Sequence, residues 1–481
     1  MKTIDQIAAE LQGYDPQSLS ADRVNDFLAR LVEPVSERES VNVLDALDRV
    51  LAEDVISPIS VPPHDNSAMD GFAFDSRQLA PGKDLTLRVV GTAFAGKAWQ
   101  GTVGTGECLK IMTGAIMPPA LDTVVPLEFV QMQGDAITLP ANAVQPGDNR
   151  RLLGEDLMAG QPALSQGQRL GPAALGLVAS LGLPSVNVYR RIRVAYFSTG
   201  DEILSLGDEP REGAVFDSNR YTVFGLLTRM GAEVIDMGVI GDDPVLLEAA
   251  FRDAAARADA IITSGGVSMG EADHTKAMMK KVGDVAFWRI AMRPGRPMAV
   301  GRIVGPHAPP LRGSLPPEGA DLAGGGPALR SDVPHTPPLR GSLPPEGAEP
   351  ALGRPGGSLA ESEKSALLFG LPGNPVAVMV TFLAFVRPAL HRLMGCTASE
   401  PVLLKAHSIE SLRKKPGRTE YQRGVVFRTA DGALQVRTTG NQGSGVLSSM
   451  VQANGLIVLH HDQGNVAAGD PVDVMMFEGV V

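Results

Sequence analysis

The sequence predicts a multidomain α/β plus β protein, with a central parallel-sheet domain and a β domain on either side of it. Short apolar runs alternate with helix-like runs between residues 191 and 301, which is typical of a parallel sheet. Short alternating segments separated by turn residues indicate β structure on both sides of this region. Glycine-rich loops follow three of the central strand-like runs, at Ser198–Glu202, Ser264–Asp273 and Leu371–Pro375.

Residues 1–60 are expected to be mainly helical, because their apolar residues recur with helical spacing, including a stretch over Val43–Leu51. Residues 61–146 change to short strands separated by Gly, Pro and Asp, which predicts a small β domain. A further helix is expected at Pro172–Leu181. We expect residues 147–190 to pack back on residues 1–60, so that an N-terminal helical and linker domain carries the small β domain as an insertion.

Capping residues set the helix boundaries in the central domain. Asp217 or Ser218 is expected to begin a helix that Gly231 ends. Asp243 caps the next helix, and Pro244 suits its first position because the missing N–H would be unbonded there. The strands are expected at Arg193–Phe197, Val234–Ile240, Ala260–Thr263, Met298–Ile303 and Leu367–Gly370.

A segment rich in Pro and Gly, residues 304–365, interrupts the central domain, which spans 191–396. It contains no aromatic residue, and the sequence PPLRGSLPPEGA occurs in it at both Pro309–Ala320 and Pro337–Ala348. Such a composition cannot bury enough apolar surface to offset its ordering entropy. It therefore predicts a disordered insertion, after which residues 397–481 form a C-terminal β domain.

Composition excludes several classes of function. The chain has 43 Lys+Arg against 54 Asp+Glu, a net charge of −11 that argues against nucleic-acid binding. Its two cysteines, Cys108 and Cys396, form neither zinc spacing nor a disulfide framework, which fits a reducing cytoplasm. The N-terminus lacks the layout of a signal peptide, and the apolar run near Val376–Val386 is too short to span a bilayer. We expect a cytoplasmic protein without membrane or nucleic-acid partners.

The loop SGGVSMGEAD is the strongest local signal for a ligand site. Gly265 and Gly266 permit close approach of the backbone to a phosphate, and Ser264 and Ser268 add hydroxyl donors. Asp273 either caps the helix that follows or, with a neighbouring glutamate, holds Mg²⁺ or positions an attacking group. The loop predicts a pocket for a phosphorylated ligand.

Two further loops carry acidic residues at the ends of predicted strands. Ser198, Thr199 and Gly200 precede Glu202 in STGDE, where the hydroxyls either cap a helix or help to build a metal–phosphate site. In GDDP, capping explains Asp243, and Asp242 is the spare carboxylate.

Cationic residues offer a second kind of site. Arg293 and Arg296 flank a Pro-Gly turn and either converge on one anion or form a solvated face. Arg423 and Ser444 add donors from the C-terminal domain. Asp70 lies in a turn-rich segment that is either a tight loop or a loop presenting this carboxylate to a site.

Ten motifs follow one another over almost the whole chain outside 304–365: NSAMDG, KIMTG, RRLLGED, STGDE, DSNR, GDDP, SGGVSMGEAD, RPGRP, GLPGNP and QRG. The set resembles the molybdopterin molybdenumtransferase family, which includes the gephyrin E-domain. The resemblance implies the last step of molybdenum cofactor assembly, in which adenylated molybdopterin receives molybdenum from molybdate and AMP is released. It implies Mg²⁺ as cofactor, a homodimer with a shared cleft, and a central molybdopterin-binding domain. The implied protein partners are the molybdopterin adenylyltransferase and molybdoenzyme chaperones.

The resemblance also assigns roles by matching motifs. The implied catalytic residues are Asp273, Glu202, Asp242 and Asp70, and the first three of these are the implied Mg²⁺ ligands. The implied substrate-binding residues are Thr113, Ser198, Thr199, Gly200, Ser264, Gly265, Gly266, Ser268, Gly373, Asn374 and Pro375. The implied molybdate-binding residues are Arg293, Arg296, Arg423 and Ser444.

The chain departs from the family pattern at a few positions. Arginine stands at 289, 293 and 296 where the family commonly has lysine, and Ala377 stands where it often has serine. Two other functions remain open at this stage. A molybdopterin adenylyltransferase resembles only residues 191–390, so the flanking domains argue against it. A non-catalytic scaffold of the gephyrin kind is disfavoured because the carboxylates and arginines are retained.

Overall fold

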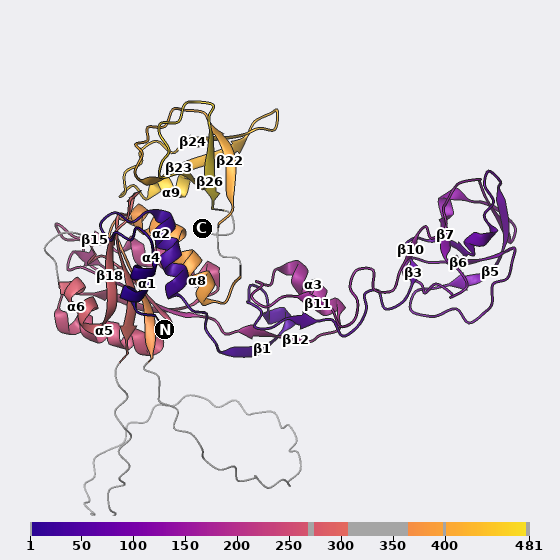
Figure 1. Ribbon diagram of the computed structural model, residues 1–481, viewed down its shortest axis with the longest axis horizontal. Coiled ribbons are helices and arrows are strands. Elements are labelled where there is room, and N and C mark those ends of the chain that lie inside the picture. The colour runs from indigo at the N-terminus through magenta and orange to yellow at the C-terminus, as the bar shows by residue number, and fades with distance from the viewer. Residues whose placement is uncertain (1, 268–273, 306–363, 398–400, 478–481) are drawn as a thin grey trace, which may run out of the picture.

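The computed structural model describes residues 2–267, 274–305, 364–397 and 401–477. The chain forms a central α/β unit, an extended connector that carries a small β domain, and a C-terminal β domain (Figure 1). Residues 306–363 of the predicted insertion lie outside the described residues, as do Ser268 and Asp273.

The described part of the central unit is built on a six-stranded sheet with the order β16-β13-β17-β21-β20-β18. The first four strands run parallel to one another, whereas β20 runs antiparallel to both β21 and β18. The sheet is therefore mixed, while the sequence predicted a parallel one. Its strands are β13 (Arg193–Thr199), β16 (Glu233–Ile240), β17 (Ala260–Ser264), β18 (Gly283–Arg289), β20 (Pro297–Val304) and β21 (Ser365–Leu371).

The helices of this unit begin and end where the capping residues predicted. The Asp217 side chain accepts from the backbone N–H of Arg220 at 3.0 Å, and Gly231 ends the same helix with φ +83°. Asp243 accepts from two backbone N–H groups at the start of the next helix. The helices are α4 (Ser218–Met230), α5 (Pro244–Arg257), α6 (His274–Val282), α7 (Pro375–Thr381), a π-helical turn (Phe382–Val386) and α8 (Arg387–Leu393); a short pair, β14 (Ile203–Leu204) and β15 (Val215–Phe216), follows β13.

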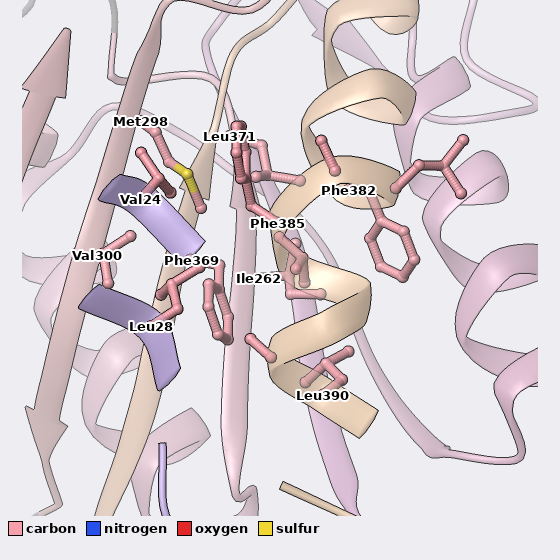
Figure 2. Packing of buried hydrophobic residues seen from close by; sticks show 14 of the residues in the cluster. Val24, Leu28, Ile262, Met298, Val300, Phe369, Leu371, Phe382, Phe385 and Leu390 are labelled. Carbon is pink, nitrogen blue, oxygen red and sulfur yellow. The ribbon is translucent and has the colours of Figure 1, made fainter. Parts of the chain in front are cut away.

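The N-terminal helices α1 (Ile4–Glu10) and α2 (Ala21–Leu31) pack on the central sheet. Figure 2 shows Val24 and Leu28 of α2 beside Phe369 of β21 and Phe385 of the π-helical turn, and all four are at most 2% exposed. The expected grouping of residues 1–60 with 147–190 is thus wrong for these helices. Their buried apolar residues belong to the same core cluster as those of the central sheet strands.

The stretch Pro375–Leu393 is long and apolar enough to cross a membrane by length and composition. It is also 78% buried inside the protein, between α2 and the sheet, which is the environment of a core helix.

The connector pairs segments from before and after the small β domain. Strand β1 (Arg38–Asn42) pairs with β12 (Ser185–Tyr189), and β2 (Val55–Ile56) pairs with β11 (Pro162–Leu164). The expected return of 147–190 toward the N-terminal segment is seen in these pairings, and the predicted helix near 172–181 is α3 (Pro172–Ser180).

The helix expected over Val43–Leu51 is wrong. Only a 3₁₀ turn forms, at Val43–Asp45, and Leu44 is 90% exposed. Val50 and Leu51 instead make β-bridges to Arg169 and Val188, so the backbone groups a helix needs are used by other segments.

The small β domain contains β3 (Asn66–Ser67), β4 (Gly71–Phe74), β5 (Leu85–Ala93), β6 (Glu107–Ile111), β7 (Thr123–Pro126), β8 (Gln131–Gln133), β9 (Ala136–Leu139) and β10 (Arg150–Arg151). The C-terminal domain contains β22 (Leu403–Ser408), β23 (Thr419–Arg428), β24 (Leu434–Thr438), α9 (Ser448–Gln452), β25 (Gly455–Leu459) and β26 (Pro471–Met476). Its strands close into a barrel because β23 pairs with both β24 and β25. The short strand β19 (Met292–Arg293) of the central unit pairs with β23 and joins the two units.

Candidate active site

Four of the glycine-rich or acidic loops start side by side at one edge of the central sheet. In the parallel register, Ser198 lies opposite Ser264, and Ser264 lies opposite Leu371. Thr199 lies opposite Ile240, the last residue before GDDP. The strands therefore end at the same level, and this edge is where open α/β sheets bind ligands.

A buried cluster of hydroxyl groups lies beneath this edge. The Tyr196 hydroxyl is 2.7 Å from Ser264 Oγ and 2.9 Å from Ser198 Oγ, and the two serine oxygens are 3.1 Å apart. Burial raises the pKa of the Tyr196 phenol well above its ordinary value. Tyr196 therefore keeps its proton and has one O–H to donate within this cluster of hydroxyl groups.

Two glycines are required by the geometry of the loops. A Cβ at Gly265, which has φ +93°, would lie 2.4 Å from the backbone oxygen of Thr199. A Cβ at Gly200, with φ +138°, would lie 2.5 Å from Glu202 Oε2. The Glu202 carboxylate thus lies close to the STG backbone, and it is the φ of Gly200 that requires glycine there.

The acidic residues of STGDE and GDDP come together. Asp201 Oδ1 accepts from the backbone N–H of Asp242 at 3.1 Å, and Glu202 and Asp201 are both exposed. No group of three or more metal-type side chains forms within the part of the chain that the structure describes. Asp273 and Ser268, predicted for this site, lie outside that part.

The C-terminal domain contributes Ser444 to the N-terminus of α7. The Asn374 amide donates to Ser444 Oγ at 3.1 Å, and the backbone N–H of Val376 donates to the Ser444 carbonyl at 3.1 Å. The RPG turn packs on the same helix, because a Cβ at Gly295 would lie 2.5 Å from Thr381 Oγ1. The structure therefore brings the turn after Arg293, the GNP segment and Ser444 onto one helix.

Arg423 is 1% exposed, and its hydrogen-bond partners lie in its own C-terminal domain. Its guanidinium donates to Ser449 Oγ at 3.0 Å and to the carbonyls of Asn441 and Gly443 at 3.2 and 2.9 Å. Burial, followed by the nearby charge of Arg293, lowers the pKa of Arg423 to about 10. Arg423 thus holds the loop that carries Ser444, in addition to bringing positive charge close to Arg293.

Arg296 lines a different hollow. A cavity of about 250 Å³ is bordered by Arg296, Arg289 and Lys276 over an apolar wall that includes Trp288 and Met298. Arg296 and Arg293 are both exposed, and the backbone N–H of Ile290 closes the turn between them by donating to the Arg296 carbonyl at 2.7 Å.

Asp70 and Thr113 form a pair in the small β domain. Asp70 Oδ1 accepts from the backbone N–H and the hydroxyl of Thr113, both at 2.7 Å, and these bonds lower the pKa of Asp70. Figure 1 shows that this domain, with β3, β6 and β7, lies at the far end of the connector from the central sheet. Within one chain, the pair therefore does not join the other predicted site residues.

Sequence reasoning missed Asp201, Asp217 and Asn219 as site residues. Asp201 was visible as the second carboxylate of STGDE, and Asp217 and Asn219 stand in the DSNR motif. The structure places Asp217 and Asn219 at the start of α4, where the Asn219 amide donates to the carbonyl of Gly373 at 2.7 Å. Asn219 borders the site through this bond to the GLPGNP loop, and Asp217 caps the same helix.

Comparison with known proteins matches this architecture throughout. Models of the MoeA N-terminal region (domains I and II), a probable molybdopterin-binding domain and the MoeA C-terminal region (domain IV) match residues 19–182, 195–392 and 405–477. A molybdopterin molybdenumtransferase of Haemophilus influenzae is 35% identical over 95% of this chain and 98% of its own length. Gephyrin of Dictyostelium discoideum is 28% identical over 92% of this chain and 60% of its own length.

A crystal structure of the molybdopterin biosynthesis moeA protein from Pyrococcus horikoshii shares the fold, with a TM-score of 0.71, 23% identity, and coverage of 96% of this chain and 100% of its own. The fold and the matched domains define a molybdopterin-binding transferase of molybdenum cofactor biosynthesis. The chain belongs to the molybdopterin molybdenumtransferase family, as its ten motifs predicted.

Proposed function

We propose that the protein transfers molybdenum from molybdate to adenylated molybdopterin and releases AMP, with the chemistry at the edge formed by the STGDE, GDDP, SGG and GLPGNP loops. The observation that carries this proposal is the contact of Ser444 with Asn374 and Val376. It joins a region of oxyanion donors to the same sheet edge as the phosphate-binding loops. The reaction brings together a substrate that contains a phosphoanhydride and the molybdate dianion. The site therefore needs donors for phosphate and donors for molybdate next to each other.

The residues at this edge suit the binding of a phosphorylated substrate. The backbone N–H of Gly266 and the hydroxyl of Thr199, which has no partner among the described residues, are the proposed donors for phosphate oxygens. The N–H of Gly265 donates to the Leu371 carbonyl at 3.2 Å, and the hydroxyls of Ser198 and Ser264 bond to each other and to Tyr196, so these groups support the edge from beneath. Gly200, Gly373 and Pro375 shape the loops around them. Molybdate, a tetrahedral dianion, would be bound by Arg293 and Ser444, with Arg423 fixing the Ser444 loop and Arg296 adding charge at the rim.

Mg²⁺ fits the donors of this site as a cofactor shared with substrate. Mg²⁺ in phosphate sites is usually held by one or two carboxylates, with phosphate oxygens and waters completing its shell. Glu202 and Asp242, whose loops meet through Asp201, supply such carboxylates, and Asp273 is proposed as a third ligand or as the catalytic base. When bound, the ion would neutralise charge on the adenylyl–phosphate linkage that is cleaved.

We further propose a homodimer in which Asp70 and Thr113 of one copy complete the site of the other. The pair lies at the far end of the connector from its own sheet edge (Figure 1). In addition, α4 and β15 expose large apolar side chains next to the site, Phe216 at 45% and Phe224 at 46%. Exposed apolar patches of this kind mark interaction surfaces.

The test of the reaction is AMP release from adenylated molybdopterin with Mg²⁺ and molybdate. Glu202→Gln and Asp273→Asn should each lower the rate at least tenfold, because each removes a carboxylate from the proposed site. Glu209→Gln, which changes an exposed carboxylate in the segment between β14 and β15, should keep the wild-type rate. A folded wild-type protein that releases no AMP would refute the proposed reaction.

The test of the shared site is complementation between two inactive variants. Asp70→Asn and Glu202→Gln would be co-refolded in equal amounts. If each site combines both copies, a mixed dimer has one intact site, and activity should recover to about a quarter of the wild-type value. No recovery from a mixture shown to contain mixed dimers would place both residues in one chain's site and contradict the proposal.

A further inference from the structure

Two polar side chains at the start of α4 each have one oxygen without a partner among the described residues. Asp217 is 4% exposed and Asn219 is 8% exposed. Asp217 Oδ1 accepts from the backbone N–H of Arg220 at 3.0 Å, whereas its Oδ2 has no hydrogen-bond partner among the described residues. Asn219 donates through Nδ2 to the Gly373 carbonyl, and its Oδ1 likewise has none among them.

Both residues border the proposed active site. Gly373 belongs to the GLPGNP loop, and the bond from Asn219 fixes this loop against α4 at 2.7 Å. Asp217 lies close enough to Tyr196 for its charge to act on the phenol, which is itself bonded to Ser198 and Ser264. Asn219 thus contacts the GLPGNP loop directly, and Asp217 caps the same helix two residues before it.

Such an arrangement is costly unless a ligand uses it. Leaving a buried polar atom unpaired destabilises the folded protein, and a charged group more than a neutral one. Nearly all buried polar groups in folded proteins have partners, so two orphaned oxygens within one helical turn require an explanation. Thr199 Oγ1, at the end of β13, is a third buried polar atom without a partner in the described residues, and it marks the same neighbourhood.

The chemistry of the two oxygens selects the ligand group. The Asn219 amide is oriented by its bond to a carbonyl, because only the NH₂ end donates, so its free end is an acceptor. A carboxylate oxygen is also an acceptor. Phosphate and molybdate offer no donor and carry like charge, so they do not suit this position. A ligand edge that carries two N–H donors side by side does.

On the basis of the proposed function, we infer that Asp217 and Asn219 accept hydrogen bonds from the amino group and the adjacent ring N–H of the substrate's pterin. A pterin presents these two donors on neighbouring atoms, which matches two acceptors at the start of one helix. The adenine of the same substrate offers an amino group flanked by ring acceptors, so it matches only one of them. With this assignment, Asp217 and Asn219 recognise the pterin ring, and other groups of the site bind the phosphates.

The test compares ligands that differ in one group. Pterin and lumazine differ at position 2, where lumazine has an oxo group in place of the amino donor. Pterin should inhibit AMP release by the wild-type protein at least tenfold more strongly than lumazine, because a site built to bond N–H rejects an analogue without it. Asp217→Asn should abolish this preference. Asparagine still caps α4, so its oxygen faces Arg220 and its NH₂ group faces the pterin donors.

Asp243→Asn is the matched control, since it removes the same charge at the cap of the neighbouring helix α5. It should retain the preference for pterin. AMP and IMP form a second ligand pair, in which the 6-amino group and the N1 acceptor of AMP are replaced by an oxo group and N1–H, and Asp217→Asn should leave their relative inhibition unchanged. The pterin assignment is overturned if Asp217→Asn instead removes a preference for AMP over IMP. It is also overturned if added Mg²⁺ restores the preference for pterin in this variant.

The same preference can be followed without turnover. The rise in thermal midpoint caused by pterin, compared with that caused by lumazine, measures binding alone. A protein that prefers pterin through Asp217 but releases no AMP would contradict the proposed reaction and support the binding site. A protein that releases AMP with no such preference would overturn the inference and leave the reaction intact.

Discussion

Arg423→Met should weaken the response to molybdate without abolishing the fold. Methionine keeps much of the length and apolar volume of the arginine stem but removes the three hydrogen bonds that the guanidinium makes to Ser449, Asn441 and Gly443. The last two lie in the loop that carries Ser444 to α7. Losing them should free this loop while the barrel strands remain paired.

The size of the effect follows from the groups left behind. Ser449 Oγ stays satisfied because it donates to the Val446 carbonyl at 2.6 Å. The carbonyls of Asn441 and Gly443 lose a charged donor, which costs about 1–3 kcal/mol each, partly offset because a buried guanidinium no longer needs desolvation. A net cost of about 1.5–3 kcal/mol for ordering the loop corresponds to a roughly 10- to 100-fold higher molybdate concentration at half-maximal rate.

The assay is AMP release as a function of molybdate at saturating adenylated molybdopterin. Arg428→Met is the matched control, because Arg428 lies on the same strand, is exposed, and donates to the Gly432 carbonyl at 3.2 Å. It should leave the molybdate response unchanged. A half-maximal molybdate concentration in Arg423→Met within twofold of the wild-type value would refute the proposed link between Arg423 and the Ser444 loop.

Three further predictions concern single residues. Gly265→Ala should reduce AMP release at least tenfold, because its Cβ would lie 2.4 Å from the Thr199 carbonyl oxygen, whereas Gly225→Ala, with open space around it, should be neutral. Asp259→Asn should lower the free energy of unfolding by about 3 kcal/mol in urea at pH 7, since it breaks a bidentate pair with an arginine. Desolvation raises the pKa of Asp259, but the hydrogen bonds and charges of the arginines outweigh it, so the folded-state pKa is lowered. The difference in unfolding free energy between the wild type and Asp259→Asn should therefore vanish as the pH falls through that pKa. Burial lowers the pKa of His391 from 6.5 to about 4, so the wild type should lose about 3 kcal/mol of stability as the pH falls through this window, and His391→Gln should not. Identical urea midpoints for variant and wild type at every pH would contradict the last two predictions.

Much of the fold could be predicted because its signals are local. The caps Asp217 and Asp243 and the C-terminal Gly231 act on backbone groups within a few residues, so their roles are visible in sequence. The alignment of Ser198 with Ser264 follows from the rule that parallel strands end at one edge. These features needed no knowledge of distant partners.

The remainder depends on which distant groups become neighbours. Val43–Leu51 has helical spacing, yet its backbone is used by β-bridges to segments more than a hundred residues away. Arg423 has the chemistry of an anion ligand in sequence, but the structure gives it carbonyl partners. The unpaired oxygens of Asp217 and Asn219 were not predictable, because an absent partner is a property of the packed protein and not of the residue type.

The hairpin formed by β20 and β21 has a consequence for how this gene can vary. Val304 lies opposite Ser365, and Gly305 donates to the Lys364 carbonyl at 2.9 Å, so the chain leaves the sheet and returns to it at adjacent positions. The two ends of the connecting segment therefore lie next to each other at the edge of the described sheet. Insertions, duplications and deletions can accumulate there without shifting any strand register. The same position is a natural site for attaching a fluorophore or affinity label to the working enzyme.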